Sequence, residues 1–335
     1  TKKLYCEIQL RTVLGDAWAV QDSKYVYKNK TGEGEPQILS KAISDILNSC
    51  ESLWDLVKIK IKGDNGDMGK ILKIRTDAEE KIKITQGEIG EENLEKNLNS
   101  WFNKHQEKAL KGLVGAGIKG LMEVKMYLPN SKLNVSKKTL NDVSRESQIH
   151  TFGWPIAAHL DREEYRPKPD TEGITAEISV RSKGWTEEDK ERITYDYWTL
   201  KQDGSFYLLK SLFEDLRKPD HLFFDTRTIR ITEVLMYALN LYSKLGVNND
   251  EPIIIEIKHG GLKGRIIGAA GNRLIFESRK SNEDEMSTTI KTSLKEIDEN
   301  MTNLVINYTR PLFEIFDFFD VGNNIIDDIV KNYVA

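Results

Sequence analysis

Three polar side chains with different chemistry alternate along the first predicted strand of the chain. In residues 4–11, apolar positions alternate with polar ones, which is typical of a half-buried strand. The open face carries Glu7, Gln9 and Arg11 in a row. A carboxylate can bind a divalent metal or take a proton, and a guanidinium can donate two parallel hydrogen bonds to a phosphate. The strand therefore has the groups for phosphate chemistry, although an ordinary solvated face has the same pattern.

Two helices are predicted directly after this strand. Thr12 is a suitable N-cap, and apolar residues at helical spacing predict a helix from about Val13 to Lys28. A glycine-containing loop follows, and then a longer amphipathic helix over 38–62 that ends before Gly63. The first 63 residues are therefore predicted to form a strand and two helices.

These opening elements resemble the closing part of a RelA/SpoT-type synthetase domain. That family has a Glu-x-Gln-x-Arg-Thr strand, which residues 7–12 match, and a Trp-Ala helix, which begins here with Trp18. The family's helix ends in Tyr-Lys, matched by Tyr27 and Lys28. The resemblance covers residues 1–62 and is carried by residue identity, strand phase and helix onset together.

The resemblance implies a reaction and roles for four residues. The family transfers pyrophosphate from ATP to the 3′-hydroxyl of a nucleotide, GTP or GDP in alarmone synthesis, and uses Mg²⁺. By position, Glu7 would bind the metal or activate the hydroxyl, and Gln9, Arg11 and Lys28 would bind nucleotide or phosphate groups. Such chemistry depends mainly on positioning and charge neutralisation. In toxin-like members the acceptor is the 3′ end of a tRNA, so the acceptor stays open.

The sequence departs from the family pattern in two ways. Asp22 and Ser23 stand where the family often has Glu-His. The family's earlier half, with a basic ATP loop, a metal-binding Asp and a base-stacking Tyr, has no counterpart here. Because the chain starts without Met and inside a predicted strand, we expect residues before Thr1 and an incomplete enzyme in this fragment. The alternative is a non-catalytic binding or sensor protein of a bacterial stress or phage-defence system.

The rest of the chain is predicted to continue as an α+β protein in three segments. Residues 64–149 are strongly charged and predict a helical connector, helical to about Tyr127. Residues 150–280 predict an α+β module with an antiparallel hairpin around Asp203-Gly204, and 281–335 predict C-terminal helices. The strands and helix expected within the module are Ile174–Arg181, Tyr195–Lys201, Thr228–Leu245 and Ile253–Ile257.

The module over 150–280 is similar to one that recurs in bacterial multidomain proteins, and that resemblance implies no activity. Its carriers are Phe152–Pro155, Tyr197-Trp198 before the hairpin turn, and Glu214-Asp215. Separately, Lys263 and Arg265 lie in a glycine-containing loop that is predicted to contact phosphate or nucleic acid. An ordinary basic loop between strands has the same composition, so both interpretations stay open.

Composition bounds the remaining possibilities. The 335 residues suffice for two or three domains, and the net charge of −4 argues against a general nucleic-acid coat, although it does not bear on a local basic groove. Two cysteines are too few for a disulfide framework and fit a reducing cytosol. No apolar run approaches the ~20 residues of a membrane span, so we expect a cytoplasmic protein without a membrane partner. The aromatic stretch 312–330 is predicted to pack on the core or to bind a protein partner or second copy.

Overall fold

The computed structural model describes residues 96–129, 131–151, 153–182, 192–270, 279–319 and 321–334. The chain divides into two compact units, Thr1–Ser100 and Trp101–Ala335. The predicted synthetase-like elements, with Glu7, Gln9, Arg11 and Lys28, lie outside the described residues. The architecture below is therefore that of the second unit.

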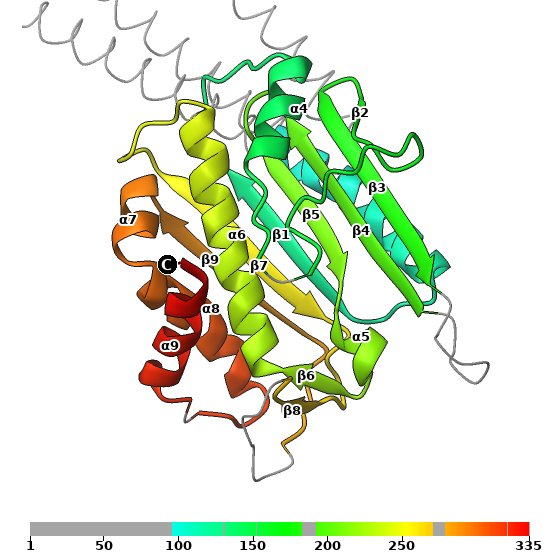
Figure 1. The fold of residues 1–335 in the computed structure, drawn as a ribbon, viewed down its shortest axis with the longest axis vertical. Coiled ribbons are helices and arrows are strands. Elements are labelled where there is room, and N and C mark those ends of the chain that lie inside the picture. The colour runs from blue at the N-terminus through cyan, green and yellow to red at the C-terminus, as the bar shows by residue number, and fades with distance from the viewer. Residues whose placement is uncertain are drawn as a thin grey trace, which may run out of the picture. The chain divides into compact units, whose positions relative to one another are not determined.

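A seven-stranded antiparallel sheet forms the centre of the second unit (Figure 1). Its strand order is β2-β3-β4-β5-β1-β7-β9. The strands are β1 (Leu121–Tyr127), β2 (Lys168–Pro169), β3 (Gly173–Ser182), β4 (Arg192–Lys201), β5 (Phe206–Ser211), β7 (Ile253–Gly260) and β9 (Glu285–Thr292). A short parallel pair, β6 (His221–Phe223) and β8 (Ile266–Gly268), forms a second sheet.

Helices cover both faces of the large sheet. The 21-residue helix α6 (Phe224–Lys244) crosses one face, and α4 (Lys137–Glu146) lies on the same side (Figure 1). The remaining numbered helices are α5 (Glu214–Arg217), α7 (Leu294–Glu299), α8 (Met301–Glu314) and α9 (Asn323–Val334). Helices α7, α8 and α9 pack against α6.

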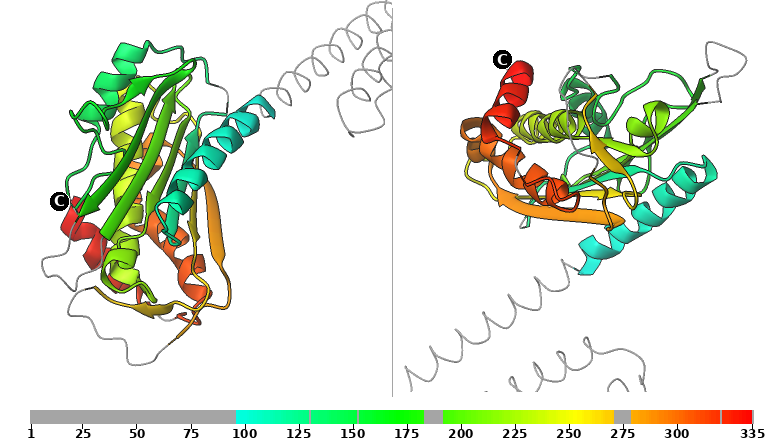
Figure 2. Two further views of the ribbon diagram at one scale, coloured as in Figure 1. Left: turned by 90° about the vertical axis from the view of Figure 1, so that its right-hand side faces the viewer. Right: turned by 90° about the horizontal axis from the view of Figure 1, so that it is seen from below.

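The opposite face is covered by the helical residues 101–115 of the second unit (Figure 2). The His105 ring nitrogen Nδ1 lies 2.6 Å from the Tyr197 hydroxyl of β4, and the Gln106 amide donates to the Glu123 carboxylate of β1 at 2.8 Å. Burial lowers the pKa of His105 to about 4, so the ring is neutral at pH 7. None of the described helices is both long enough and apolar enough to cross a membrane.

Period-two alternation explains how β7 joins the core. Ile253, Ile255 and Ile257 are buried, while the residues between them are half-buried. The Tyr308 hydroxyl of α8 donates to the Ile255 carbonyl at 2.8 Å, which ties the C-terminal helices to the centre of the sheet. Phe313, which α8 also supplies, packs edge-on against Phe224 of α6.

Several sequence predictions are confirmed by these elements. The described residues form a mixed α+β fold with an antiparallel sheet, and the turn at Asp203-Gly204 joins β4 to β5. Gly204 has a φ of 85°, a backbone conformation that glycine adopts without strain. The predicted helix over 228–245 is α6, and the predicted strand over 253–257 lies in β7.

Two segments differ from their predicted secondary structure. Residues up to Tyr127 were expected to be helical, but β1 is a strand between β5 and β7. Its alternation buries Met122, Val124 and Met126 on one face, a pattern that the surrounding charged sequence obscures. β9 lies where C-terminal helices were expected, because its polar, alternating residues pair with β7 as an edge strand. The compact unit therefore crosses the expected boundaries at 149/150 and 280/281.

The aromatic stretch over 312–330 contributes to the core. Leu312, Phe313 and Phe316 are buried, whereas the Phe319 side chain is 64% exposed. Packing of this stretch against the core, one of its two predicted roles, is thus observed for these three buried residues. Its use as a contact for a protein partner stays a prediction.

Candidate functional site

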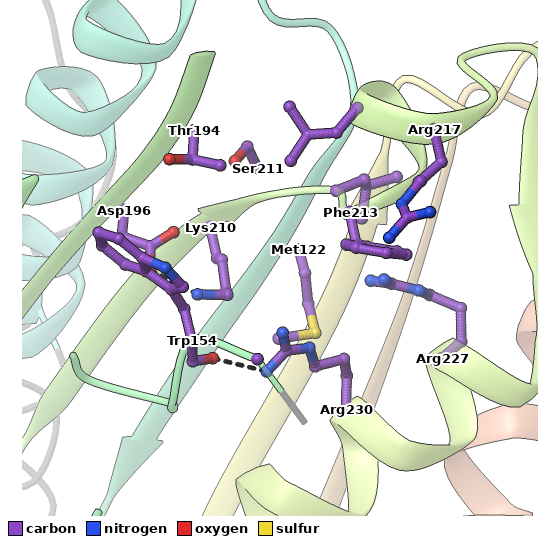
Figure 3. Close-up of a pocket in the computed structure, with 13 residues that line it drawn as sticks. Met122, Trp154, Thr194, Asp196, Lys210, Ser211, Phe213, Arg217, Arg227 and Arg230 are labelled. Carbon is purple, nitrogen blue, oxygen red and sulfur yellow. Dashed lines mark hydrogen bonds and ion pairs between the residues drawn. The ribbon is translucent and has the colours of Figure 1, made fainter. Parts of the chain in front are cut away.

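A cavity of about 360 Å³ lies between the sheet and α6 (Figure 3). Its walls come from β1, β4, β5, α5, the first two turns of α6, and the loop at Gly153 and Trp154. These segments are far apart in the sequence and meet only through the sheet topology. The cavity volume is at the lower end of the ~300–1,000 Å³ that is usual for ligand sites.

Four cationic side chains and one carboxylate line this cavity. The cations are Lys210, Arg217, Arg227 and Arg230, and the carboxylate is Asp196. Charged residues are rarely buried unless they are paired, so each of the buried groups among them needs a partner or water. Each cation has different partners, and those partners determine which cations still have donors for a ligand.

Lys210 and Asp196 form a cross-strand ion pair on the cavity side of the sheet. The two residues stand opposite each other in the β4–β5 register, and Lys210 Nζ lies 2.5 Å from Asp196 Oδ2. Their side chains are only 9% and 4% exposed. Desolvation by burial lowers the pKa of Lys210 below its usual value, although the Asp196 carboxylate opposes this shift. Such perturbed groups in a cavity are typical of functional sites.

Arg227 of α6 forms a bidentate pair with Glu214. Its Nε donates to Oε1 at 3.0 Å and its Nη2 donates to Oε2 at 2.8 Å. The Phe223 backbone N–H also donates to this carboxylate, at 3.0 Å. The Arg227 and Glu214 side chains are 2% and 0% exposed. These bonds leave Nη1 of Arg227 without a partner in the described part of the chain, and the guanidinium points toward the cavity in Figure 3.

Arg230 joins α6 to the loop that carries Trp154. Its Nη1 donates to Glu233 Oε2 at 2.7 Å and to the Trp154 carbonyl at 2.7 Å (Figure 3). The Thr151 hydroxyl donates to the same Glu233 carboxylate at 2.6 Å. Gly153 has a φ of 62°, which glycine adopts without strain at this bend. The half-buried Trp154 is therefore held at the cavity by a hydrogen bond to its backbone carbonyl, which does not involve its indole ring.

Arg217 is the exposed cation of the cavity. It ends α5, and its guanidinium carbon lies 5.4 Å from the centroid of the Phe213 ring. A guanidinium over an aromatic face is attracted by the ring quadrupole but keeps its donors for other groups. Arg217 is thus suited to meet a charged ligand at the mouth of the cavity.

The charges of the site leave a net positive cavity with apolar walls. The carboxylates of Asp196, Glu214 and Glu233 balance three of the four cations. Met122, Trp154, Leu212, Phe213 and Leu216 supply apolar and aromatic surface. This combination favours a small molecule that has a planar or apolar body and an anionic group.

The two basic residues predicted from the sequence lie outside the cavity. The Lys263 side chain is exposed, and its backbone N–H donates to Asp284 Oδ1 at 3.3 Å. Arg265 is buried, and its Nη2 donates to Asp215 Oδ1 at 2.5 Å while its Nη1 donates to the His221 carbonyl at 3.2 Å. Arg265 therefore holds its loop against α5 and β6. Phosphate contact by this loop stays a prediction, with Lys263 as its exposed cation.

Two of the sequence motifs meet at the cavity. Gly153 and Trp154 line it, and Glu214 pairs with the cavity residue Arg227. Sequence reasoning missed the cations themselves and Asp196. A signal was present in α6, because Arg227 and Arg230 interrupt an otherwise apolar helix face at a spacing of three, where buried charge is unusual.

The described residues hold no group of three or more His, Cys, Asp or Glu side chains that could bind a metal ion. The Mg²⁺ ligand implied by the family resemblance, Glu7, lies outside the described residues. Comparisons of the chain with protein-family models, curated proteins and solved structures found no match. The candidate site is therefore defined by its own geometry.

Proposed function

We propose that residues 101–335 form a binding module for an anionic small molecule, which is seated in the cavity beside α6. The observation that carries this proposal is the convergence of four cationic side chains on one cavity with aromatic walls. An anion there would bond to the exposed Arg217 and to Nη1 of Arg227, because the other donors of Arg227 are used by Glu214. Charge-assisted hydrogen bonds of this kind are the strong ones in ligand recognition.

Calorimetry on the full chain tests this function. The protein is titrated in EDTA with inorganic pyrophosphate, citrate, ribose 5-phosphate and nucleoside monophosphates. We expect at least one anion to bind, and Arg217→Gln to weaken it about 10-fold, since a hydrogen bond to a charged group is worth ~1.5 kcal/mol. Lys218→Gln, which removes the neighbouring exposed cation outside the cavity, is the matched control and should leave binding unchanged.

Two results would overturn the binding function. One is that no anion binds at millimolar concentration. The other is binding that is the same in Arg217→Gln as in the unmodified protein, because the anion would then lie elsewhere.

We also propose that residues 1–62 contribute pyrophosphate transfer from ATP to the 3′-hydroxyl of GTP or GDP, which the module regulates. The support is the Glu-x-Gln-x-Arg-Thr strand and the Trp-Ala helix in the sequence. Glu7 would hold Mg²⁺ or activate the hydroxyl, while Gln9, Arg11 and Lys28 would bind the nucleotides. A tRNA 3′ end is the alternative acceptor, and a binding or sensor protein without catalysis is the alternative function.

Labelled ATP distinguishes these alternatives. The full chain is incubated with ATP, Mg²⁺ and GDP, GTP or tRNA, and the acceptor that gains label is identified. Glu7→Gln should abolish transfer, whereas Glu33→Gln, in the predicted loop before the second helix, should not. If no acceptor gains label, pyrophosphate transfer is refuted and only the binding function remains. Full activity of Glu7→Gln would refute the role of Glu7.

A further inference from the structure

We propose that the ligand of the cavity is a nucleoside monophosphate, with its phosphate beside Arg217 and Arg227 and its base beside Trp154. This inference rests on the function proposed above, that the cavity binds an anionic small molecule. It goes further because it assigns different chemistry to the two ends of the cavity.

The phosphate end is formed by two guanidinium groups. Arg217 of α5 lies over the Phe213 ring, and in Figure 3 Arg227 of α6 points into the cavity from the same side of the view. Arg217 keeps its donors because it contacts Phe213 through the ring face. Arg227 presents Nη1 beyond its bidentate pair with Glu214. Planar guanidinium groups match the geometry of phosphate oxygens, and two of them can share one phosphate.

The base end is formed by an indole ring and a carboxylate. Trp154 is fixed through its carbonyl by Arg230 at 2.7 Å, so its ring can serve as a stacking surface. Asp196 also lines the cavity, and its Oδ2 accepts from Lys210. The other oxygen, Oδ1, has no hydrogen-bond donor in the described part of the chain. A nucleobase fits this end, because it has a flat face that can stack on indole and N–H groups that can donate to a carboxylate.

The size of the cavity limits the ligand to one nucleotide unit. Its volume of about 360 Å³ is small for a ligand site, so a polynucleotide could enter only with one residue. The apolar side chains of Met122 and Leu212 also line the cavity.

Calorimetry in EDTA tests the inference on the full chain, because EDTA removes the Mg²⁺ that the proposed synthetase chemistry needs. AMP, GMP, CMP and UMP are compared with ribose 5-phosphate and with the matching nucleosides. We expect at least one monophosphate to bind about 10-fold more tightly than both ribose 5-phosphate and its own nucleoside, as base stacking on an aromatic ring supports. Arg217→Gln should weaken the monophosphate and ribose 5-phosphate alike.

Trp154→Leu provides the second comparison. It should remove the advantage of the monophosphate over ribose 5-phosphate and leave ribose 5-phosphate binding unchanged, whereas Trp154→Phe should keep most of the advantage. Phe319→Leu, at an exposed aromatic side chain outside the cavity, is the matched control. The comparison among ligands on the unmodified protein remains decisive even if Trp154→Leu fails to fold.

The inference is overturned if no monophosphate binds more tightly than ribose 5-phosphate, or if Trp154→Leu weakens both equally. In either case, anion binding that depends on Arg217 would still support the proposed binding function. If no anion shows binding that depends on Arg217, the binding function and the inference both fail.

Discussion

Replacing Glu214 by glutamine should destabilise the second unit strongly, because it removes the carboxylate that pairs with the buried Arg227. The Glu214 carboxylate is fully buried and accepts from Nε and Nη2 of Arg227 at 3.0 and 2.8 Å. It also accepts from the backbone N–H of Phe223 at 3.0 Å. Glutamine has nearly the same shape, so the substitution removes charge while it leaves packing in place.

The magnitude follows from the bonds that are lost. Each hydrogen bond between charged groups contributes about 1.5–3 kcal/mol, so two of them contribute roughly 3–6 kcal/mol. The glutamine oxygen keeps one bond to the Arg227 guanidinium, worth about 1 kcal/mol. Breaking a buried ion pair from one side typically costs about 3–5 kcal/mol. We therefore expect Glu214→Gln to lower the free energy of unfolding by about 3 kcal/mol.

Urea unfolding of the full chain, followed by tryptophan fluorescence, measures this loss in a double-mutant cycle with Arg227→Met. The loss of unfolding free energy in the double variant should be smaller than the sum of the two single losses, by at least about 2 kcal/mol. The reason is that the double variant leaves no unpaired buried charge. Glu163→Gln is the control, since Glu163 is 77% exposed in its ion pair with Arg166. That change should stay within about 0.5 kcal/mol. A loss below about 1 kcal/mol for Glu214→Gln, or additive losses, would refute the reasoning.

Three further predictions concern the packing and the pH dependence of the second unit. Gly173→Ala should lower the free energy of unfolding in urea by about 1–3 kcal/mol or more, because the added Cβ would lie 2.0 Å from the Leu200 carbonyl oxygen. Gly115→Ala is the control and should be neutral or slightly stabilising, because there is open space around the added methyl group. Tyr237→Phe should leave stability unchanged or raise it by up to about 1 kcal/mol, since the buried hydroxyl has no hydrogen-bonding partner among the described residues; a loss above that size would contradict this. Burial lowers the pKa of His105 to about 4, so the unfolded state takes up a proton near pH 6.5 that the folded state does not. The free energy of unfolding should therefore fall by about 2–3 kcal/mol between pH 6.5 and pH 4. His105→Gln should make this fall with pH smaller, and an unchanged pH dependence would contradict the lowered pKa of His105.

Local sequence patterns predicted the elements whose signals lie within the element itself. The Asp203-Gly204 turn is such a case, because glycine provides the positive φ that a tight hairpin needs. The helix α6 and the strand β7 have strong apolar periodicity and were predicted within a few residues of their bounds. β1 and β9 were missed because their pairing partners lie far away in the chain. The edge strand β9 is also polar along most of its length.

The candidate site was only partly predictable for the same reason. Phe152–Pro155 and Glu214-Asp215 stood out in the sequence as a compact aromatic turn and an acidic pair. Nothing local marks Lys210 as a cavity residue, since an isolated lysine in a strand is usually solvated. Its burial follows from the β4–β5 register, which sets it opposite Asp196, and from α6, which covers that face.

The sequence by itself determined an α+β protein, its hairpin and its long apolar helix, while phosphate chemistry at Glu7, Gln9 and Arg11 stays a prediction. Only the tertiary structure shows that charges from separate segments share one cavity. It also shows that the Arg265 side chain is hydrogen-bonded to Asp215 of the same unit. The physical reason is that hydrophobic periodicity is a local property, whereas the partner of a buried charge is chosen by non-local strand pairing and helix packing.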